Sequence, residues 1–81
     1  MLKPNASYSF TMRLHYPNEI GMFSRIAEAI SAAKGDVGAI DIVQVTGEHM
    51  ERDVTVNAAD EQHAAAILAH VSEVPGVSVV N

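Results

Sequence analysis

The sequence predicts an α+β fold of the ferredoxin-like βαββαβ type, with two helices on one face of a four-stranded antiparallel sheet. The chain has 81 residues, which is enough for one small domain. A strand pattern, a helix pattern and another strand pattern follow one another twice along it. Because strand–helix–strand crossovers are right-handed, two such units place both helices on the same face. We expect a single domain over residues 7–81, preceded by an N-terminal extension over residues 1–6.

The first predicted strand covers Ser7–Tyr16, where large apolar residues alternate strictly with polar ones. This alternation is typical of a strand with one buried face. An amphipathic helix is predicted over residues 23–33, because its apolar residues recur at spacings of three and four. Gly35 follows it, at the position where many helices end on a left-handed residue. The helix is defined by Phe23, Ile26, Ala29, Ile30 and Ala33.

The next two strands, Ala39–Thr46 and Arg52–Ala58, form a hairpin around Gly47–His49. A turn centred near Glu48 predicts the register of this hairpin. In that register four apolar side chains share the core face, with Ile40 opposite Val56 and Ile42 opposite Val54.

The last helix and strand complete the βαββαβ order. Asp60 is a suitable N-cap for the helix, and Pro75-Gly76 breaks the chain after it. A short strand is expected over Val77–Val80. The apolar stripe of this second helix consists of Ala64, Ile67, Leu68 and Val71.

Composition and charge exclude several classes of function. The net charge is −5 and the five Lys and Arg residues are scattered, which argues against a nucleic-acid partner. The absence of cysteine excludes disulfides, thiolate nucleophiles and Cys-based metal sites. The N-terminus lacks a signal-peptide layout, and no apolar run approaches the ~20 residues of a membrane span. We therefore expect a cytoplasmic protein without a membrane partner.

The sequence offers no catalytic or metal-binding pattern. His15, His49, His63 and His70 show no i, i+4 pair and no carboxylate at ligand spacing, so they are expected to be exposed and unliganded. Ser24 lacks a G-x-S-x-G setting. We expect no catalytic residue and no metal ligand, and hence a domain that is not an enzyme in itself.

The turn Asn18–Met22 has the chemistry of a small-molecule site. It precedes a helix, whose first backbone N–H groups are unpaired and favour a carboxylate or phosphate. Gly21 allows close approach, and the Asn18 side chain both donates and accepts hydrogen bonds. The alternative is purely local, with Asn18 as a helix cap and Gly21 as a residue that relieves the turn.

The second strand is expected at an edge of the sheet, where unpaired backbone groups need a partner. Its only charged residue is Asp41, and Val43 and Val45 are expected to project away from Ile40 and Ile42. We expect this strand to pair with the same strand of a second copy, which makes a continuous eight-stranded sheet. The alternative is that these valines are ordinary exposed apolar residues.

These segments together resemble a known family. The pattern strand–PNEIGMF–helix–KGDVGAIDIV–hairpin–RDVTVNAAD–helix–VPGV resembles the ACT domain, a ligand-sensing βαββαβ module attached to metabolic enzymes. The resemblance covers about residues 7–80. Within the family, GAIDIV followed by RDVTVNA is most similar to the ACT domain ahead of the catalytic part of some bacterial NAD-dependent malic enzymes.

The resemblance implies a regulatory domain that binds a small metabolite between two copies. The turn after the first strand of one copy and the turn after the first helix of the other hold the ligand. Asn18 and Gly21 match the family pattern, whereas Asp36 replaces a common asparagine, Ile20 a proline, and Tyr16 the histidine of the serine-binding relative. The expected ligand-binding residues are Asn18, Glu19, Ile20, Gly21, Met22 and Asp36.

The resemblance also implies the partners of this domain. A carboxylate at Asp36 favours a ligand ammonium and opposes a dicarboxylate, so the expected effector is a neutral amino acid. The alternative for Asp36 is that it simply lies in solvent after Gly35. The homodimer is expected to form through Ala39–Thr46 and the first helix. No cofactor is expected in this domain, because NAD and a divalent metal belong to an attached catalytic region. The alternative is a dimerisation module that has lost its ligand.

Overall fold

The computed structural model describes residues 5–80 and confirms the predicted fold class. Six elements follow one another along the chain, namely β1 (Asn5–Pro17), α1 (Met22–Ala32), β2 (Asp36–Val45), β3 (His49–Ala58), α2 (Glu61–Ser72) and β4 (Ser78–Val79). Most of the predicted N-terminal extension, residues 1–4, lies outside the described residues, as does Asn81. The boundaries of the domain therefore stay a prediction.

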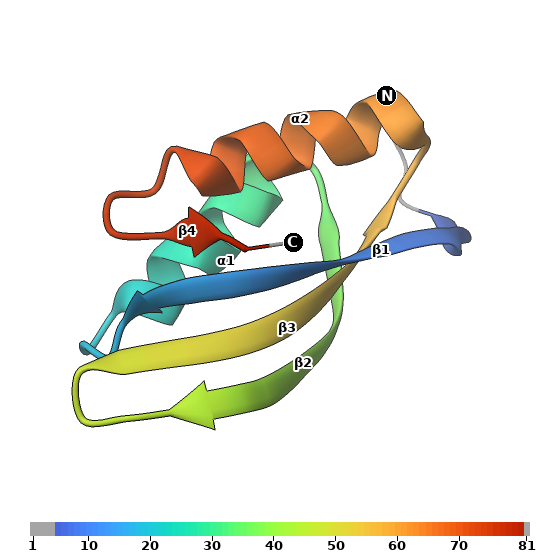
Figure 1. The fold of residues 1–81 in the computed structure, drawn as a ribbon. Helices are drawn as coiled ribbons and strands as arrows, with labels where there is room; N and C mark the ends of the chain where they lie inside the picture. Colours follow the sequence, from blue (N-terminus) through green and yellow to red (C-terminus); the bar gives the residue numbers. More distant parts are fainter. Residues whose placement is uncertain (1–4, 81) are drawn as a thin grey trace.

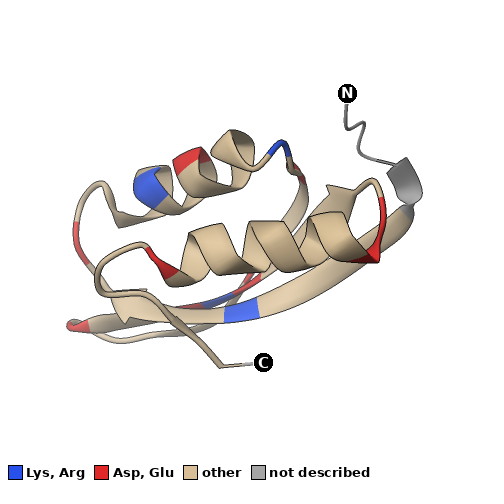
Figure 2. Ribbon diagram, turned by 90° about the horizontal axis from the view of Figure 1, so that it is seen from above, with Lys and Arg blue, Asp and Glu red and all other residues tan. Residues whose placement is uncertain are grey.

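The sheet is antiparallel with strand order β2-β3-β1-β4, so β2 and β4 lie at the edges as predicted. Both helices lie on the same side of it (Figure 1). Seen from above, they run side by side in front of the sheet (Figure 2). The other side of the sheet is left open.

The core lies between the two central strands and the two helices. From Tyr8 to Tyr16, the even-numbered residues of β1 face the helices, which confirms the predicted alternation. Fully buried branched residues from both helices meet them, because the helix spacing of three and four turns these residues to one face. The most deeply buried side chains are Met12, Leu14, Val54, Val56, Ile26, Ile30, Ile67 and Val71.

The predicted register of the β2–β3 hairpin is wrong. Ile40 lies opposite Val54, and Ile42 lies opposite Arg52. Irregularities between Val37 and Ala39, and between Ile42 and Gln44, shift the pairing along β2. Each irregularity inserts one extra residue into this edge strand, which counting from the turn cannot anticipate.

The shifted register leaves the apolar residues of β2 uncovered. Ile40 and Ile42 face the side of the helices but remain 42% and 63% exposed, so they are not core residues. Val45 pairs with Met50, which places it on the same side as Ile42 and not on the opposite side as predicted. β2 therefore carries an exposed apolar row on its helix-facing side, which we call the β2 row: Ile40, Ile42 and Val45.

The end of α1 differs from the prediction in one detail. Lys34, not Gly35, has the left-handed backbone, with φ of 66°. Glycine is required at position 35 because the neighbouring core side chains leave no room for a Cβ atom. A Cβ atom there would lie 2.9 Å from Ile30 Cγ2, 2.9 Å from Ile67 Cδ1 and 3.1 Å from Val56 Cγ1.

His63 is buried at 3% exposure, which corrects the expectation that the histidines are all exposed. The backbone N–H of Ala59 donates to its Nδ1 at 2.9 Å. The ring proton is therefore on Nε2, which donates to the Ala33 carbonyl at 2.7 Å. Asp60 caps α2 as predicted, by accepting from the His63 backbone N–H. The His63 ring thus joins the start of α2 to the end of α1.

We predict that Gly35→Ala destabilises the domain by about 1–3 kcal/mol, because the added methyl group overpacks three core side chains. Gly47→Ala is the matched control, since a Cβ atom at Gly47 has no neighbour within 4 Å. It should change the free energy of unfolding by less than about 0.5 kcal/mol. Urea unfolding of the two variants measures both values, and equal effects would contradict the close packing at Gly35.

Candidate functional site

The turn between β1 and α1 presents unpaired backbone donors. Gly21, with φ of 87°, is the N-cap residue of α1 and supplies no side chain to cap it. The backbone N–H groups of Phe23 and Ser24 have no acceptor among the described residues. These groups carry the partial positive charge of the helix N-terminus and are suited to an anion.

Asn18 does not cap α1, so the local alternative for this residue does not hold. Its backbone N–H donates to the Glu48 carbonyl at 2.8 Å. Its side-chain Nδ2 donates to the Thr46 carbonyl at 3.0 Å. Asn18 therefore ties the turn before α1 to the turn between β2 and β3.

The other residues predicted in this turn have different surroundings. Glu19 and Ile20 are exposed, and Ile20 is exposed completely. Met22 is buried, and its Cε atom lies 3.5 Å from the place where Gly76 would carry a Cβ. Only the backbone of Met22 is therefore available to a ligand, because its side chain belongs to the core.

Asp36 lies at the other end of the sheet. It is exposed and pairs with Asn57, whereas Pro17, next to Asn18, pairs with His49. These two positions on β3 are eight residues apart, which is roughly 27 Å in a strand that rises about 3.4 Å per residue. One copy of the chain cannot bring Asn18 and Asp36 to the same small molecule.

Two polar side chains on the helix-facing side of the sheet lack partners. The hydroxyl of Tyr16 and Nε of Arg52 are buried without a hydrogen bond among the described residues. Burial raises the pKa of Tyr16, and the nearby charge of Arg52 acts in the opposite direction. The Arg52 guanidinium lies 5.0 Å from the centre of the Phe23 ring, in the first turn of α1. A buried donor without an acceptor costs about 1–3 kcal/mol, so both groups need an explanation.

Sequence reasoning did not identify Arg52 as a site residue, although a signal was present. Arg52 has the same parity as Val54 and Val56 on β3, so its side chain starts on the core side of the sheet. A single arginine on the apolar face of a strand is unusual, and such a position is a candidate for a functional site.

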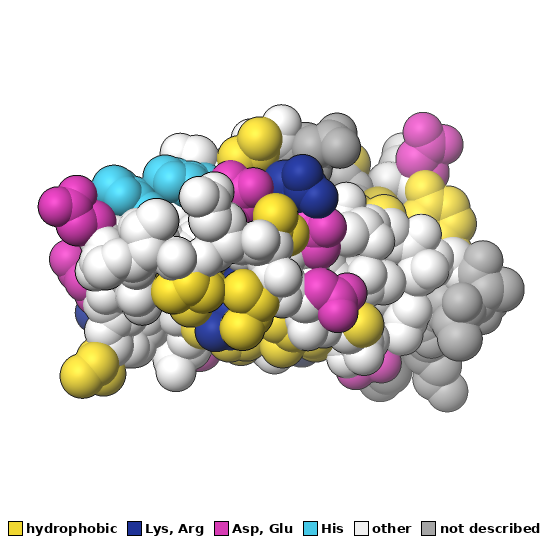
Figure 3. Space-filling view, turned by 60° about the horizontal axis from the view of Figure 1, so that its bottom comes forward, with side chains coloured by type: hydrophobic (Ala, Val, Ile, Leu, Met, Phe, Trp, Pro, Cys, Tyr) yellow, Lys and Arg dark blue, Asp and Glu magenta, His cyan; other side chains and the backbone are white. Residues whose placement is uncertain are grey.

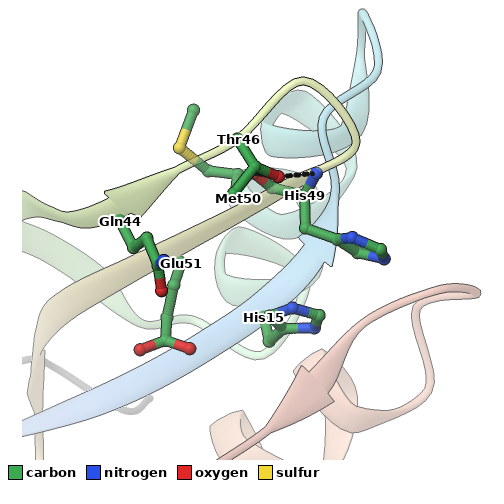
Figure 4. A pocket seen from close by; sticks show the side chains of 6 residues that line it. All are labelled: His15, Gln44, Thr46, His49, Met50 and Glu51. Atoms are coloured by element: carbon green, nitrogen blue, oxygen red, sulfur yellow. Dashed lines mark hydrogen bonds between the residues drawn. The ribbon is translucent and has the colours of Figure 1, made fainter.

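A hollow of about 140 Å³ lies at the end of the β2–β3 hairpin (Figure 4). The rings of His15 and His49 are stacked beside it with centroids 4.7 Å apart. Thr46 orders the turn, because its Oγ1 accepts from the His49 backbone N–H at 2.9 Å. The lining residues are His15, Gln44, Thr46, His49, Met50 and Glu51.

The hollow is small for a metabolite, because small-molecule sites usually span about 300–1,000 Å³. In residues 5–80, no group of three or more His, Asp or Glu side chains is arranged to hold a metal ion. The hollow also lies beside His15, on the side of the sheet opposite Tyr16. It therefore lies mainly on the open side of the sheet, although Thr46 at its edge also accepts the hydrogen bond from Asn18.

The remaining charges do not form a binding surface for nucleic acid. Among residues 5–80, Lys and Arg are spread over α1, the turn after it, β1 and β3 (Figure 2). Arg13 donates through Nε and Nη2 to both carboxylate oxygens of Asp53, at 2.8 and 3.0 Å. None of the described helices is long and apolar enough to cross a membrane.

We predict that the Arg13–Asp53 ion pair makes stability depend on acid pH. The hydrogen bond from Arg13 holds the pKa of Asp53 below its ordinary value of 3.8. The pair therefore stabilises the fold above pH 3.8 and loses this effect as the pH falls through the lowered pKa. Urea unfolding at several pH values should show wild type more stable than Asp53→Asn at pH 7, with the difference vanishing in acid. Glu28→Gln, on the exposed face of α1, is the control, and a difference that persists in acid would contradict the prediction.

Two solved structures share this fold. The ACT domain of GTP pyrophosphokinase from Chlorobium tepidum matches with a TM-score of 0.72 at 14% identity, over 89% of this chain and 92% of that one. A homoserine dehydrogenase from Thiobacillus denitrificans matches with a TM-score of 0.62 at 11% identity, over 88% of this chain and 16% of that one. At such low identity these matches show the fold alone.

Sequence comparison is more specific. The NAD-dependent malic enzyme of Geobacillus stearothermophilus is 36% identical over 80 residues, which are 99% of this chain and 17% of the length of that enzyme. The predicted relation to malic enzymes is therefore confirmed for this segment. The family model described as the ACT domain matches residues 4–81. With the βαββαβ topology and the match over almost its whole length, the chain belongs to the ACT domain family.

Proposed function

We propose that this chain is an effector-binding regulatory domain that works as a dimer within a malic enzyme-like protein. The observation that carries the proposal is the separation of Asn18 from Asp36, because only a second copy brings both to one ligand. NAD and a divalent metal would belong to the catalytic region of the longer protein, and its setting would be cytoplasmic. Neither nucleic acid nor a membrane is a proposed partner.

The β2 row supports a second copy as the occupant of this edge. Figure 3 brings the bottom of Figure 1, where β2 lies, to the front, and hydrophobic side chains gather at its centre. An apolar edge strand with free backbone groups favours addition of another strand. Antiparallel pairing about a two-fold axis is self-complementary and closes the assembly at two copies.

This pairing would create a composite site. Antiparallel β2 strands place the Val45 end of one copy beside the Asp36 end of the other. Asn18 is held to Thr46, directly after Val45, so the turn before α1 would come close to Asp36 of the second copy. An amino acid would direct its carboxylate to the free amides of α1 and its ammonium to Asp36.

Regulation requires that the effector prefers one dimer arrangement. A ligand that binds two arrangements equally shifts nothing, however tightly it binds. A site divided between two copies meets this requirement, since any movement of one copy against the other changes its geometry. We propose that the bound arrangement biases the attached catalytic regions.

A second candidate function is ligand-free assembly of catalytic subunits. It is favoured by the hydrogen bond from Asn18 Nδ2 to Thr46, which uses one of the groups expected to hold the ligand. Asp36 and Ile20, where relatives often have asparagine and proline, also fit a site without a ligand.

We predict that Ile42→Lys converts the dimer to a monomer that remains folded. Ile42 is already 63% exposed in the single chain, so the substitution leaves the core intact but places charge in the proposed interface. Val80→Lys, beside the opposite edge strand, is the control and should remain dimeric. Sedimentation velocity measures the mass of each variant. Wild-type monomers at tens of micromolar, or dimeric Ile42→Lys, would contradict the β2 interface.

Thermal shift tests the choice between sensor and assembly module. A ligand that binds only the folded protein raises its melting temperature. We expect one class among the twenty amino acids and the common dicarboxylates, each at millimolar concentration, to raise the melting temperature of wild type. Asn18→Ala should melt at a lower temperature without ligand, because it loses the bond to Thr46, and should gain nothing from the ligand. A dimer that responds to no compound would favour the assembly module.

A further inference from the structure

The unpartnered groups of Tyr16 and Arg52 lie together. Tyr16 is only 3% exposed, and its hydroxyl has no partner in the part of the chain that the structure describes. Nε of Arg52 is equally unpartnered, and the one ion pair within residues 5–80 joins two other residues. Tyr16 pairs with Met50 and Leu14 pairs with Arg52, so Tyr16 and Arg52 are diagonal neighbours on one face of the two central strands.

Each unpaired group around this point can donate a hydrogen bond, and only the Tyr16 hydroxyl can also accept one. Phe23, whose ring covers the Arg52 guanidinium, belongs to the first turn of α1. The amides of Phe23 and Ser24 in that turn have no acceptor either. A guanidinium, a phenol hydroxyl and two amides offer many donors and one positive charge. An anion with several acceptor oxygens satisfies them together.

The chain's own carboxylates near β3 are engaged elsewhere. Asp53 accepts two hydrogen bonds from Arg13. Glu51 lines the hollow beside His15, on the open side of the sheet. These acids alternate with Arg52 along β3, so they start on the opposite face. Neither of these acids supplies the missing acceptor, which leaves a place for one from another molecule.

We propose that Tyr16 and Arg52 form a carboxylate-binding subsite beneath the first turn of α1, and that the effector is a small carboxylic acid. The inference rests on the proposed function and adds the group by which the effector is recognised. A carboxylate matches the planar fork of arginine and carries the single negative charge that one guanidinium balances. A phosphate carries up to two charges and would leave one unpaired here.

The subsite opens toward the edge that a second copy would cover. Arg52 pairs with Ile42 on β2, and Ile42 is largely exposed. The Tyr16 hydroxyl itself is covered in the unliganded chain, so binding requires the side chains above it to shift. A carboxylate in this position would lie within the interface and thus respond to the arrangement of the two copies.

Isothermal titration of the 81-residue chain tests the subsite. The probes are the twenty amino acids, L-malate, fumarate and succinate, each compared with its carboxamide. Tyr16→Phe and Arg52→Gln should each weaken binding of the active acid by about tenfold or more. Tyr8→Phe, on the same side of β1, and Arg13→Gln, on the open side of β1, are matched controls and should bind like wild type. Unliganded Tyr16→Phe should melt no lower than wild type, because it loses only an unpaired hydroxyl.

The outcomes separate the inference from the function on which it rests. If an acid binds wild type and both variants equally well, the subsite is wrong but the proposed sensor function stands. The same conclusion follows if a carboxamide binds wild type as tightly as its acid. No binding of any probe to wild type would overturn both. Sedimentation velocity without ligand tests whether the second copy of the chain supplies the acceptor instead. If Tyr16→Phe or Arg52→Gln dissociates the dimer, the second copy supplies the acceptor and the subsite is wrong.

Discussion

The two helices cover little more than the two central strands, and the rest of the structure follows from this limit. Helices of 11 and 12 residues bury most of the helix-facing side chains of β1 and β3. Beyond Val37, β2 continues the sheet past the helices, so the β2 row stays exposed. The exposed row on β2 is thus a consequence of the architecture, and a second copy is the simplest way to cover it.

The order of the elements could be predicted from the sequence because it depends on local periodicity. Alternation in β1 and the spacing of apolar residues in both helices each reflect one buried face, and Asp60 marks a cap. The register of β2 depends on two irregularities at an edge, where little packing constrains the strand. The close packing at Gly35 involves Ile30, Val56 and Ile67. Because Val56 and Ile67 are distant in sequence, the local sequence around Gly35 could not predict it.

The candidate site was only partly predictable for the same reason. The amides of α1 follow from the position of Gly21 before a helix. The bond from Asn18 to Thr46 joins residues 28 positions apart and depends on how two turns meet in the folded chain. The unpartnered hydroxyl of Tyr16 is likewise invisible in a sequence, because an aromatic residue on the core face normally indicates packing. Arg52 is the exception, because a charged residue at a core-facing position of a strand can be recognised in the sequence.

The bond between Asn18 and Thr46 gives the proposed effector a route to the dimer. It joins the turn before α1, where the effector would bind, to the end of β2, where the two copies would pair. A ligand that reorders the turn therefore acts on the strand at the interface through two hydrogen bonds, from the Asn18 side chain to Thr46 and from its backbone to Glu48. Because the same turn carries the first amides of α1, the proposed binding and the proposed pairing would share one small piece of backbone, which would couple them.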